Sequence, residues 1–279
     1  MRLPRSVAST MFIATLLVLC FTTCVSASDS APSALAAIKV RGALVMVCFP
    51  HQDNPFIQVN LKKGPMKKIG TAADFKGVDV DLMSEFAKSI GVSLEVRPIS
   101  TPSYAELIPA LLAGPGDLIA SSFSVTPARV SQVDFSDPYF EVYQVVLVHR
   151  DSKIAGPKDL AGTTAVVVPG AMMEATIREF GVPEERIHHQ GFTRDVLLEV
   201  LNREADFTVI ELDEFGTRTP LLKEFSKLKV AFKVGRSEPY AFAVPKGSDL
   251  REALNGFIAT VRESGELAAT IKRNIIPYK

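Results

Sequence analysis

The order of the apolar segments constrains the fold most, because strand-like and helix-like patterns alternate along this chain in two series. The first series consists of a strand at 44–49, a helix at 78–90, a strand at 92–96, a helix at 104–112 and a strand at 117–120. The second follows residue 150 and consists of strands at 164–168, 207–210 and 227–234, helices at 172–180 and 194–202, and closing helices at 248–264 and 265–274. Such alternation predicts an α/β fold with mostly parallel sheets flanked by helices.

Two extended segments, at 142–149 and 239–244, connect the two series. They predict two lobes joined by a two-segment hinge, so that the chain enters the second lobe at the first segment and returns at the second. The closing helices then belong to the first lobe. Such an architecture binds a small ligand in the cleft and closes on it, while the connecting segments absorb the change in backbone angles.

The N-terminal segment has the composition of a secretory signal peptide. Arg2 and Arg5 precede an apolar run at 11–21, and small residues follow at 25–27. This pattern predicts cleavage after Ala27. The apolar run is about half of the ~20 residues that a transmembrane helix needs, so a permanent anchor is the weaker interpretation.

The prediction of a cleaved signal peptide also bears on the three cysteines of the chain. A lipoprotein acylated at Cys20 or Cys24 is the alternative to a cleaved signal peptide, although Thr22-Thr23 before Cys24 matches the usual lipobox poorly. After cleavage only Cys48 is left, and one cysteine cannot form an internal disulfide. Cys48 ends an apolar run, so we expect a buried and unreactive thiol.

The charge of the chain argues against several classes of partner. The 31 Lys and Arg residues balance 31 Asp and Glu, and loss of Arg2 and Arg5 with the signal peptide leaves a net charge near −2. We therefore expect no binding to nucleic acid or to an anionic membrane. The sequence has no nucleotide-binding glycine loop, and we expect no cofactor. We interpret His188-His189 as solvated loop histidines rather than as metal ligands.

Residues 121–140, SSFSVTPARVSQVDFSDPYF, carry the strongest indication of function. The hydroxyls of Ser122, Ser124 and Thr126 alternate along an extended run, which predicts that they share one face of a strand end. Arg129 can reach back to the same point. Hydroxyls with one guanidinium suit a carboxylate, because the planar guanidinium makes two parallel charge-assisted hydrogen bonds.

This segment resembles the signature of the family 3 extracellular solute-binding proteins, the amino-acid receptors of ABC-type importers. Six further segments match family patterns in the same order: GALV at 42–45, DNPF at 53–56, GVDVDL at 77–82, LIPAL at 107–111, DLAG at 159–162 and EPYA at 238–241. Each match is weak alone, but together they cover nearly the whole mature chain. The resemblance implies the two-lobed fold of type II periplasmic binding proteins, with lobe 1 at 28–144 plus 240–279 and lobe 2 at 145–239.

The resemblance also implies how a ligand would be held. Arg129 would bind its α-carboxylate, and the three hydroxyls of the 121–140 segment would assist. Backbone N–H groups after Gly170, at a helix N-terminus of lobe 2, would add donors. Tyr104 would stack against the ligand from lobe 1, and Glu211 would pair with its ammonium group.

The chain departs from the family pattern at three places. Ala171 and Met172 stand where hydroxyl residues usually donate to the ligand. Glu211 replaces the usual aspartate and is one methylene longer. Asp53 replaces a tyrosine of the lid, where a carboxylate could favour a cationic or polar ligand side chain; a solvated loop aspartate is the alternative. We expect an α-amino acid ligand, with a muropeptide-like or other modified ligand as the alternative.

These observations predict a monomeric periplasmic receptor, not an enzyme, that delivers a polar or charged amino acid to an inner-membrane ABC permease. The alternative is an enzyme on the same scaffold, similar to cyclohexadienyl dehydratases, with Glu211 or Asp53 as its general acid. A muropeptide-binding sensor is a further alternative. The stretch 57–76, which holds Lys62, Lys63, Lys67 and Lys68, predicts a solvated hairpin extension rather than a basic docking patch.

Overall fold

The structure, a computed structural model of the chain, describes residue 1 and residues 33–51, 54–60, 69–212 and 226–275. Asp53, Lys62, Lys63, Lys67, Lys68 and residues 2–32 lie outside the described residues. Helices flank two separate larger sheets, which confirms the α/β class. We call the six-stranded sheet with its helices lobe 1 and the five-stranded sheet with its helices lobe 2.

Lobe 1 is built on a sheet with the strand order β3-β5-β1-β6-β13-β7. Its strands are β1 (Ala43–Cys48), β3 (Gly70–Thr71), β5 (Ser93–Pro98), β6 (Leu118–Ile119), β7 (Asp134–Phe135) and β13 (Ala243–Val244). All residues of β1 are buried, and it pairs in parallel with β5 and β6. A strand covered on both faces needs a continuous apolar sequence, as ALVMVC provides. The short strands β2 (Gln58–Val59) and β4 (Phe75–Lys76) form an antiparallel pair beside this sheet.

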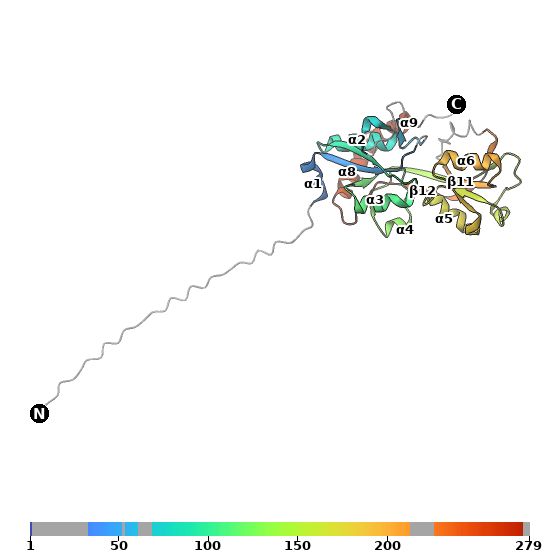
Figure 1. Cartoon of the computed structure of the whole chain (residues 1–279). Coiled ribbons are helices and arrows are strands. Elements are labelled where there is room, and N and C mark those ends of the chain that lie inside the picture. The colour runs from blue at the N-terminus through green and yellow to red at the C-terminus, as the bar shows by residue number, and fades with distance from the viewer. Residues whose placement is uncertain (2–32, 52–53, 61–68, 213–225, 276–279) are drawn as a thin grey trace. The chain divides into compact units, whose positions relative to one another are not determined.

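The helices of lobe 1 are α1 (Ala34–Arg41), α2 (Val78–Ser89), α3 (Leu107–Ala113), α4 (Pro127–Val130), α8 (Leu250–Glu263) and α9 (Glu266–Asn274). Helices α2 and α9 lie side by side in contact (Figure 1). Helix α2 buries Val78, Leu82 and Phe86, and each such side chain contributes about 1.5–3 kcal/mol. The sequence did not predict α1, which starts where the Ser33 hydroxyl accepts a hydrogen bond from the Ala36 N–H.

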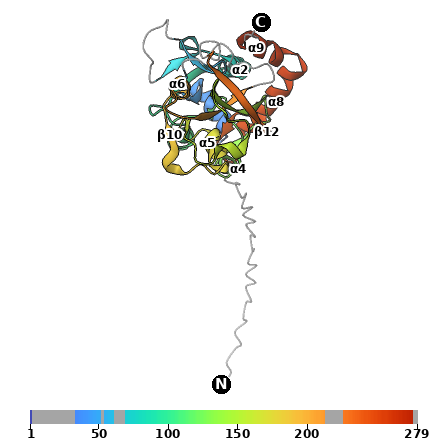
Figure 2. The ribbon, with the colours of Figure 1, turned by 90° about the vertical axis from the view of Figure 1, so that its right-hand side faces the viewer.

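Lobe 2 is built on a sheet with the strand order β10-β9-β11-β8-β12. Its strands are β8 (Phe140–His149), β9 (Ala165–Val167), β10 (Ile187–His189), β11 (Phe207–Leu212) and β12 (Leu228–Tyr240), and its helices are α5 (Met172–Glu179) and α6 (Thr193–Asn202). Helices α5 and α6 lie on opposite sides of β11 (Figure 1). In the view from the lobe 2 side, α5, α6 and β10 lie to one side of the long strand β12, which is an edge strand of the sheet (Figure 2).

Both sheets are mixed, so the expectation of mostly parallel sheets is correct only in part. The parallel pairs are β1–β5, β1–β6, β9–β10 and β9–β11; the others are antiparallel. The antiparallel pair β8–β12 carries the chain into and out of lobe 2, and its pairing extends to Phe140 and Tyr240. The extended segment 142–149 lies within this pair. The boundaries of the lobes in the sequence stay a prediction.

Apolar packing is continuous between the lobes. Val47, Leu107 and Leu111 of lobe 1 belong to the same buried cluster as the strands of lobe 2. A second cluster lies under α2, α8 and α9 and contains Cys48, which is buried as expected. Burial raises the pKa of the Cys48 thiol far above its ordinary value. Within the described residues, no helix combines the length and the apolar character that crossing a membrane requires.

Candidate ligand-binding site

Arg129 reaches back to the 121–124 segment, as the sequence predicted. It lies on α4, whose first turn is fixed by Pro127 and by the Thr126 hydroxyl, which accepts a hydrogen bond from the Arg129 N–H. Its Nη1 donates to the Ser124 carbonyl at 2.8 Å, and its Nη2 donates to the Gly170 carbonyl of lobe 2 at 3.2 Å. Burial lowers the pKa of the guanidinium to about 10, although nearby Tyr104 and Glu211 act in the opposite direction.

The three hydroxyls do not share one face, so that expectation is wrong. Ser122 has a φ of 45°, which interrupts the extended run that the alternation assumed. Its Oγ accepts a hydrogen bond from Asn54 Nδ2 at 3.2 Å. Ser124 Oγ instead donates to Glu211 Oε1 at 3.0 Å, and Thr126 caps α4. Ser124 thus contacts both Arg129, through its carbonyl, and Glu211, through its hydroxyl.

Glu211 brings a buried carboxylate from β11 of lobe 2 to the same point. Its Oε2 accepts a hydrogen bond from the Tyr240 hydroxyl at 2.6 Å, in addition to the bond from Ser124. A guanidinium and a carboxylate, both buried, therefore meet around one serine, which binds the first through its carbonyl and the second through its hydroxyl. Tyr240 belongs to β12, and the sequence analysis did not identify it as a site residue.

Tyr104 lies in an aromatic cluster at the junction of the lobes. Its ring stacks on Phe49, with ring centroids 4.7 Å apart and an interplanar angle of 15°. Its hydroxyl lies 2.6 Å from His51 Nε2, and Phe192 of lobe 2 meets the same Phe49 edge to face. His51 is buried, and the sequence analysis missed it because a single histidine in a loop has no periodic signal.

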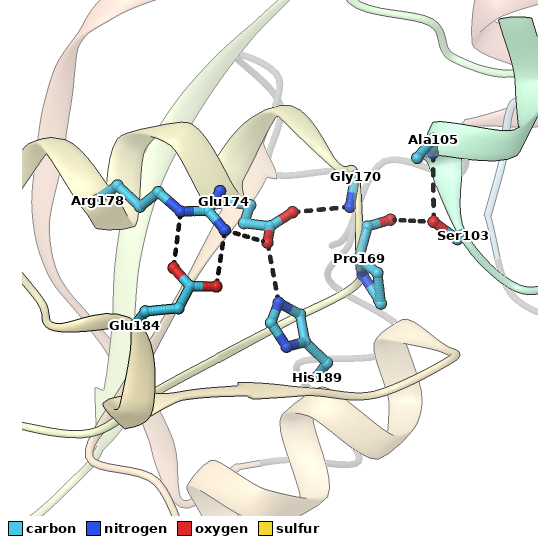
Figure 3. A network of polar contacts seen from close by, with 8 residues as sticks. All are labelled: Ser103, Ala105, Pro169, Gly170, Glu174, Arg178, Glu184 and His189. Carbon is cyan, nitrogen blue, oxygen red and sulfur yellow. Dashed lines mark hydrogen bonds and ion pairs between the residues drawn. The ribbon is translucent and has the colours of Figure 1, made fainter.

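The loop before α5 forms direct contacts with lobe 1 (Figure 3). The Pro169 carbonyl accepts hydrogen bonds from the Tyr104 N–H at 2.9 Å and from the Ser103 hydroxyl at 3.2 Å. Gly170 has a φ of 69°, and a Cβ added there would lie 2.3 Å from the Ala105 nitrogen. Glycine is therefore required at this position both by the backbone angle and by the close approach of the other lobe.

Glu174 in the first turn of α5 binds this loop on the side opposite to Ala105 of lobe 1 (Figure 3). Its Oε2 accepts a hydrogen bond from the Gly170 N–H at 2.7 Å, so this N–H group is not directed at a ligand. Its Oε1 lies 2.9 Å from His189 Nε2 and 2.8 Å from Arg178 Nη2. Partial burial raises the pKa of Glu174, but the hydrogen bonds from these three neighbours together hold it below its ordinary value. The Ala171 N–H donates to the Val168 carbonyl, at 3.2 Å.

The expectation of solvated loop histidines is correct only in part, because both side chains are exposed but lie on a strand and have acidic partners. His188 and His189 lie on β10, where Nδ1 of the first is 2.9 Å from Glu199 Oε2 and the second binds Glu174. Potential ligand atoms of Glu174, Glu184 and His189 lie within 4.8 Å of one another. Arg178 donates to both of these carboxylates (Figure 3), so the cluster already contains its own cation and forms an ion-pair network.

Comparison with known proteins places these residues in a family context. A sequence profile of the bacterial extracellular solute-binding proteins, family 3, matches residues 57–275. The chain is 31% identical over 244 residues to a membrane-bound lytic murein transglycosylase F of Desulfosudis oleivorans, covering 85% of this chain but 49% of that protein. It thus spans about half the length of this relative. It is 29% identical to a probable histidine-binding protein of Neisseria gonorrhoeae, covering 74% of this chain and 77% of that one.

Solved structures of amino-acid-binding proteins also resemble this chain. A mutant of ArgBP from T. maritima superposes with a TM-score of 0.73 at 29% identity, over 86% of this chain and 98% of that one. The ancestral amino acid-binding protein AncCDT-1, a precursor of cyclohexadienyl dehydratase, superposes with a TM-score of 0.71 at 28% identity, over 87% and 99%. The family profile covers well over half of the chain. The protein therefore belongs to family 3 of the bacterial extracellular solute-binding proteins.

Proposed function

We propose that this protein is a periplasmic receptor that binds an α-amino acid with a polar or charged side chain between its lobes and delivers it to an ABC permease. One observation carries the proposal: a buried guanidinium and a buried carboxylate, Arg129 and Glu211, meet at Ser124. A zwitterionic α-amino acid carries the two complementary charges on adjacent groups. Relatives named as histidine-binding and arginine-binding support an amino-acid ligand.

The two charged residues would have distinct roles. Arg129 would bind the ligand carboxylate, for which its planar donor pair is suited. Glu211 would pair with the ammonium group, with Ser124 and Tyr240 fixing its orientation. Tyr104 would contribute its ring from lobe 1, and Asp53 would favour a cationic or polar ligand side chain.

The test is a thermal-shift screen of the protein, purified after export of the full chain, against the common L-amino acids, cyclohexadienyl acids and murein fragments. A ligand that binds only the folded state raises the melting temperature with concentration. We expect a shift with one class of amino acid. Truncating one partner of a buried charge pair costs about 2–5 kcal/mol, whereas a neutral hydroxyl bond contributes about 1 kcal/mol.

Arg129→Ala should therefore abolish measurable binding in isothermal titration, while Ser124→Ala should weaken it about tenfold or less. Equal losses in the two variants would contradict the assigned roles. A melting-temperature increase with murein fragments alone would contradict the amino-acid proposal and favour the muropeptide alternative, which the similarity to the transglycosylase keeps open.

An enzyme on this scaffold is the second candidate, because AncCDT-1 is described as a precursor of a dehydratase. Glu211 would then be the proton donor. Both of its oxygens accept a hydroxyl hydrogen bond, an arrangement that suits a partner for an ammonium group better than a proton donor. Turnover of a cyclohexadienyl acid that disappears in Glu211→Gln would favour the enzyme.

A further inference from the structure

A carboxyl group that the proposed site does not use lies beneath it. Asp79 is the second residue of α2 and is 0% exposed, between the buried side chains of Val78 and Val80. Its Oδ1 accepts a hydrogen bond from the Tyr139 hydroxyl at 2.5 Å, and its Oδ2 accepts one from the Ser122 N–H at 2.7 Å. The N-terminal end of α2 adds a partial positive charge, which favours the ionised carboxylate.

Ser122 has a backbone conformation that its surroundings must maintain. Among the described residues, it is one of two non-glycine residues with a positive φ, here 45°. A residue with a side chain is disfavoured in this region and stays there only where its neighbours hold it. Asp79 holds its N–H, and Asn54 Nδ2 donates to its Oγ.

The conformation of Ser122 sets the direction of the two residues that follow. The guanidinium carbon of Arg129 lies over the Phe123 ring, 3.9 Å from the ring centroid. Ser124 binds Arg129 through its carbonyl and Glu211 through its hydroxyl. A change in backbone angle at Ser122 would therefore displace the point at which both charged groups meet.

We propose that Asp79 is a positioning residue of the ligand site: its ionised carboxylate holds Ser122 in the left-handed conformation that ligand binding requires, so proton uptake by Asp79 weakens binding. This inference rests on the proposed function. It assigns a role to the GVDVDL segment, which the amino-acid receptor proposal itself does not explain.

The two protonation states differ in how firmly they hold Ser122. A charged acceptor makes a stronger hydrogen bond to an N–H group than a neutral carboxyl does. When Asp79 takes up a proton, the Tyr139 hydroxyl can rotate to accept it, and the Ser122 N–H is left with a weaker acceptor. Among the described residues, the titratable groups that face Asp79 are the Tyr139 hydroxyl and the Cys48 thiol.

Burial raises the pKa of Asp79 to about 7, although the hydrogen bonds from Tyr139 and Ser122 lower it in part. The proposed change therefore occurs between pH 5.5 and 8.5. If the ligand binds only the form with an ionised Asp79, the affinity falls about tenfold for each pH unit below this midpoint. That gives about a 30-fold weaker affinity at pH 5.5 than at pH 8.5.

The experiment combines a ligand-free readout with a binding readout on the purified full chain. In protein labelled with ¹⁵N-serine, the Ser122 amide signal is assigned by its loss in Ser122→Ala and followed against pH. We expect it to titrate with a midpoint near pH 7, and to stop titrating in Asp79→Asn. In parallel, isothermal titration measures the affinity for L-arginine, the ligand of several similar structures. We expect the 30-fold fall in the native protein and a flat profile in Asp79→Asn.

Two further variants separate positioning from general damage to α2. Asp81→Asn removes a carboxylate of the same helix that binds Asn274 at 2.8 Å, and it should leave both pH profiles unchanged. Tyr139→Phe removes one hydrogen bond to the ionised Asp79 and should move the Ser122 midpoint to higher pH, while the amide still titrates.

A Ser122 amide that does not titrate, or that titrates equally in Asp79→Asn, would overturn the proposal. An L-arginine affinity that stays constant while the amide titrates would overturn it as well. If neither L-arginine nor any other amino acid binds at any pH, the proposed function fails, and the amide titration by itself still decides whether Asp79 holds Ser122.

Discussion

Replacing Gly170 by alanine should prevent the lobes from closing, because the space that its side chain would need is occupied by Ala105 of lobe 1. An added Cβ would lie 2.3 Å from the Ala105 nitrogen and 2.8 Å from the Ala105 Cβ. Both atoms belong to a short helical turn whose neighbouring Tyr104 N–H is bonded to Pro169. Backbone atoms cannot move aside as the end of a long side chain can, so we expect the variant to open the lobes instead.

The magnitude follows from the contacts that opening would break. These are the bonds from the Tyr104 N–H and the Ser103 hydroxyl to Pro169 and from Arg129 Nη2 to Gly170. At about 0.5–1.5 kcal/mol each, the three bonds amount to about 1.5–4.5 kcal/mol. Ligand affinity should fall by about 10- to 2,000-fold. The left-handed φ adds about 1–2 kcal/mol of strain to the folded state, independently of closure.

Gly181→Ala is the matched control for that strain. Gly181 follows the end of α5 with a φ of 77°, and an added Cβ there would have no heavy atom within 4 Å. Thermal unfolding should show the cost of the left-handed φ in both variants and a larger destabilisation in Gly170→Ala, which also loses the contacts between the lobes. Isothermal titration should show lost affinity only in Gly170→Ala, and small-angle X-ray scattering with ligand present should show a larger radius of gyration for that variant. Equal affinities of the two variants would refute the idea that the contact between Gly170 and Ala105 closes the site.

Two further predictions concern buried groups beneath the site. The raised pKa of Asp79 means that, between pH 4 and 7, the folded protein binds a proton that the unfolded chain has released, so the stabilisation is complete below about pH 4 and is lost as pH rises through about 7. A pKa about three units above the ordinary value corresponds to roughly 4 kcal/mol of folding stability. Urea unfolding should show the free energy of unfolding falling by this amount as pH rises in the native protein, and a flatter profile in Asp79→Asn. Identical profiles in the two proteins would contradict the prediction. The second prediction concerns Cys48, which is fully buried and whose thiol pKa is raised. It should react with a thiol reagent only at the rate of global unfolding. Fast labelling under native conditions would contradict this and would show that β1 opens locally.

The sequence predicted most elements because their patterns are local. Helix α2 was expected at 78–90 and runs from Val78 to Ser89, since its buried apolar residues recur at helical spacing. Helix α1 was not predicted because only Ile38 of its residues is buried, so it has no apolar periodicity. Its limits depend on the cap residues Ser33 and Gly42. Strand β12 was expected to end at residue 234, yet it continues to Tyr240 through two shifts of register that interrupt the alternation.

The site was predictable only in part, because its geometry depends on contacts between distant residues. Arg129 could be identified from the segment around it. The hydrogen-bond partners of the three hydroxyls could not be identified in this way, because the expected alternation assumes a regular strand and Ser122 adopts a positive φ. Asp79 shows the same limit: its hydrogen bond to Ser122 joins residues 43 positions apart, and an aspartate in the first turn of a helix is usually solvated.

The departures of this chain from the family pattern have a common physical consequence. The N–H groups of Gly170 and Ala171 are bound to Glu174 and to the Val168 carbonyl, so the start of α5 does not present these two donors to a ligand. Under the proposed function, recognition of a ligand carboxylate would then depend more heavily on Arg129. Glu211 reaches Ser124 and Tyr240 with its longer side chain, and its carboxylate is thereby held at the junction of the lobes. In the proposed receptor, ligand selection would therefore concentrate on one opposite-charge pair, and Ser122 and Asp79 would fix the point at which the two charges meet.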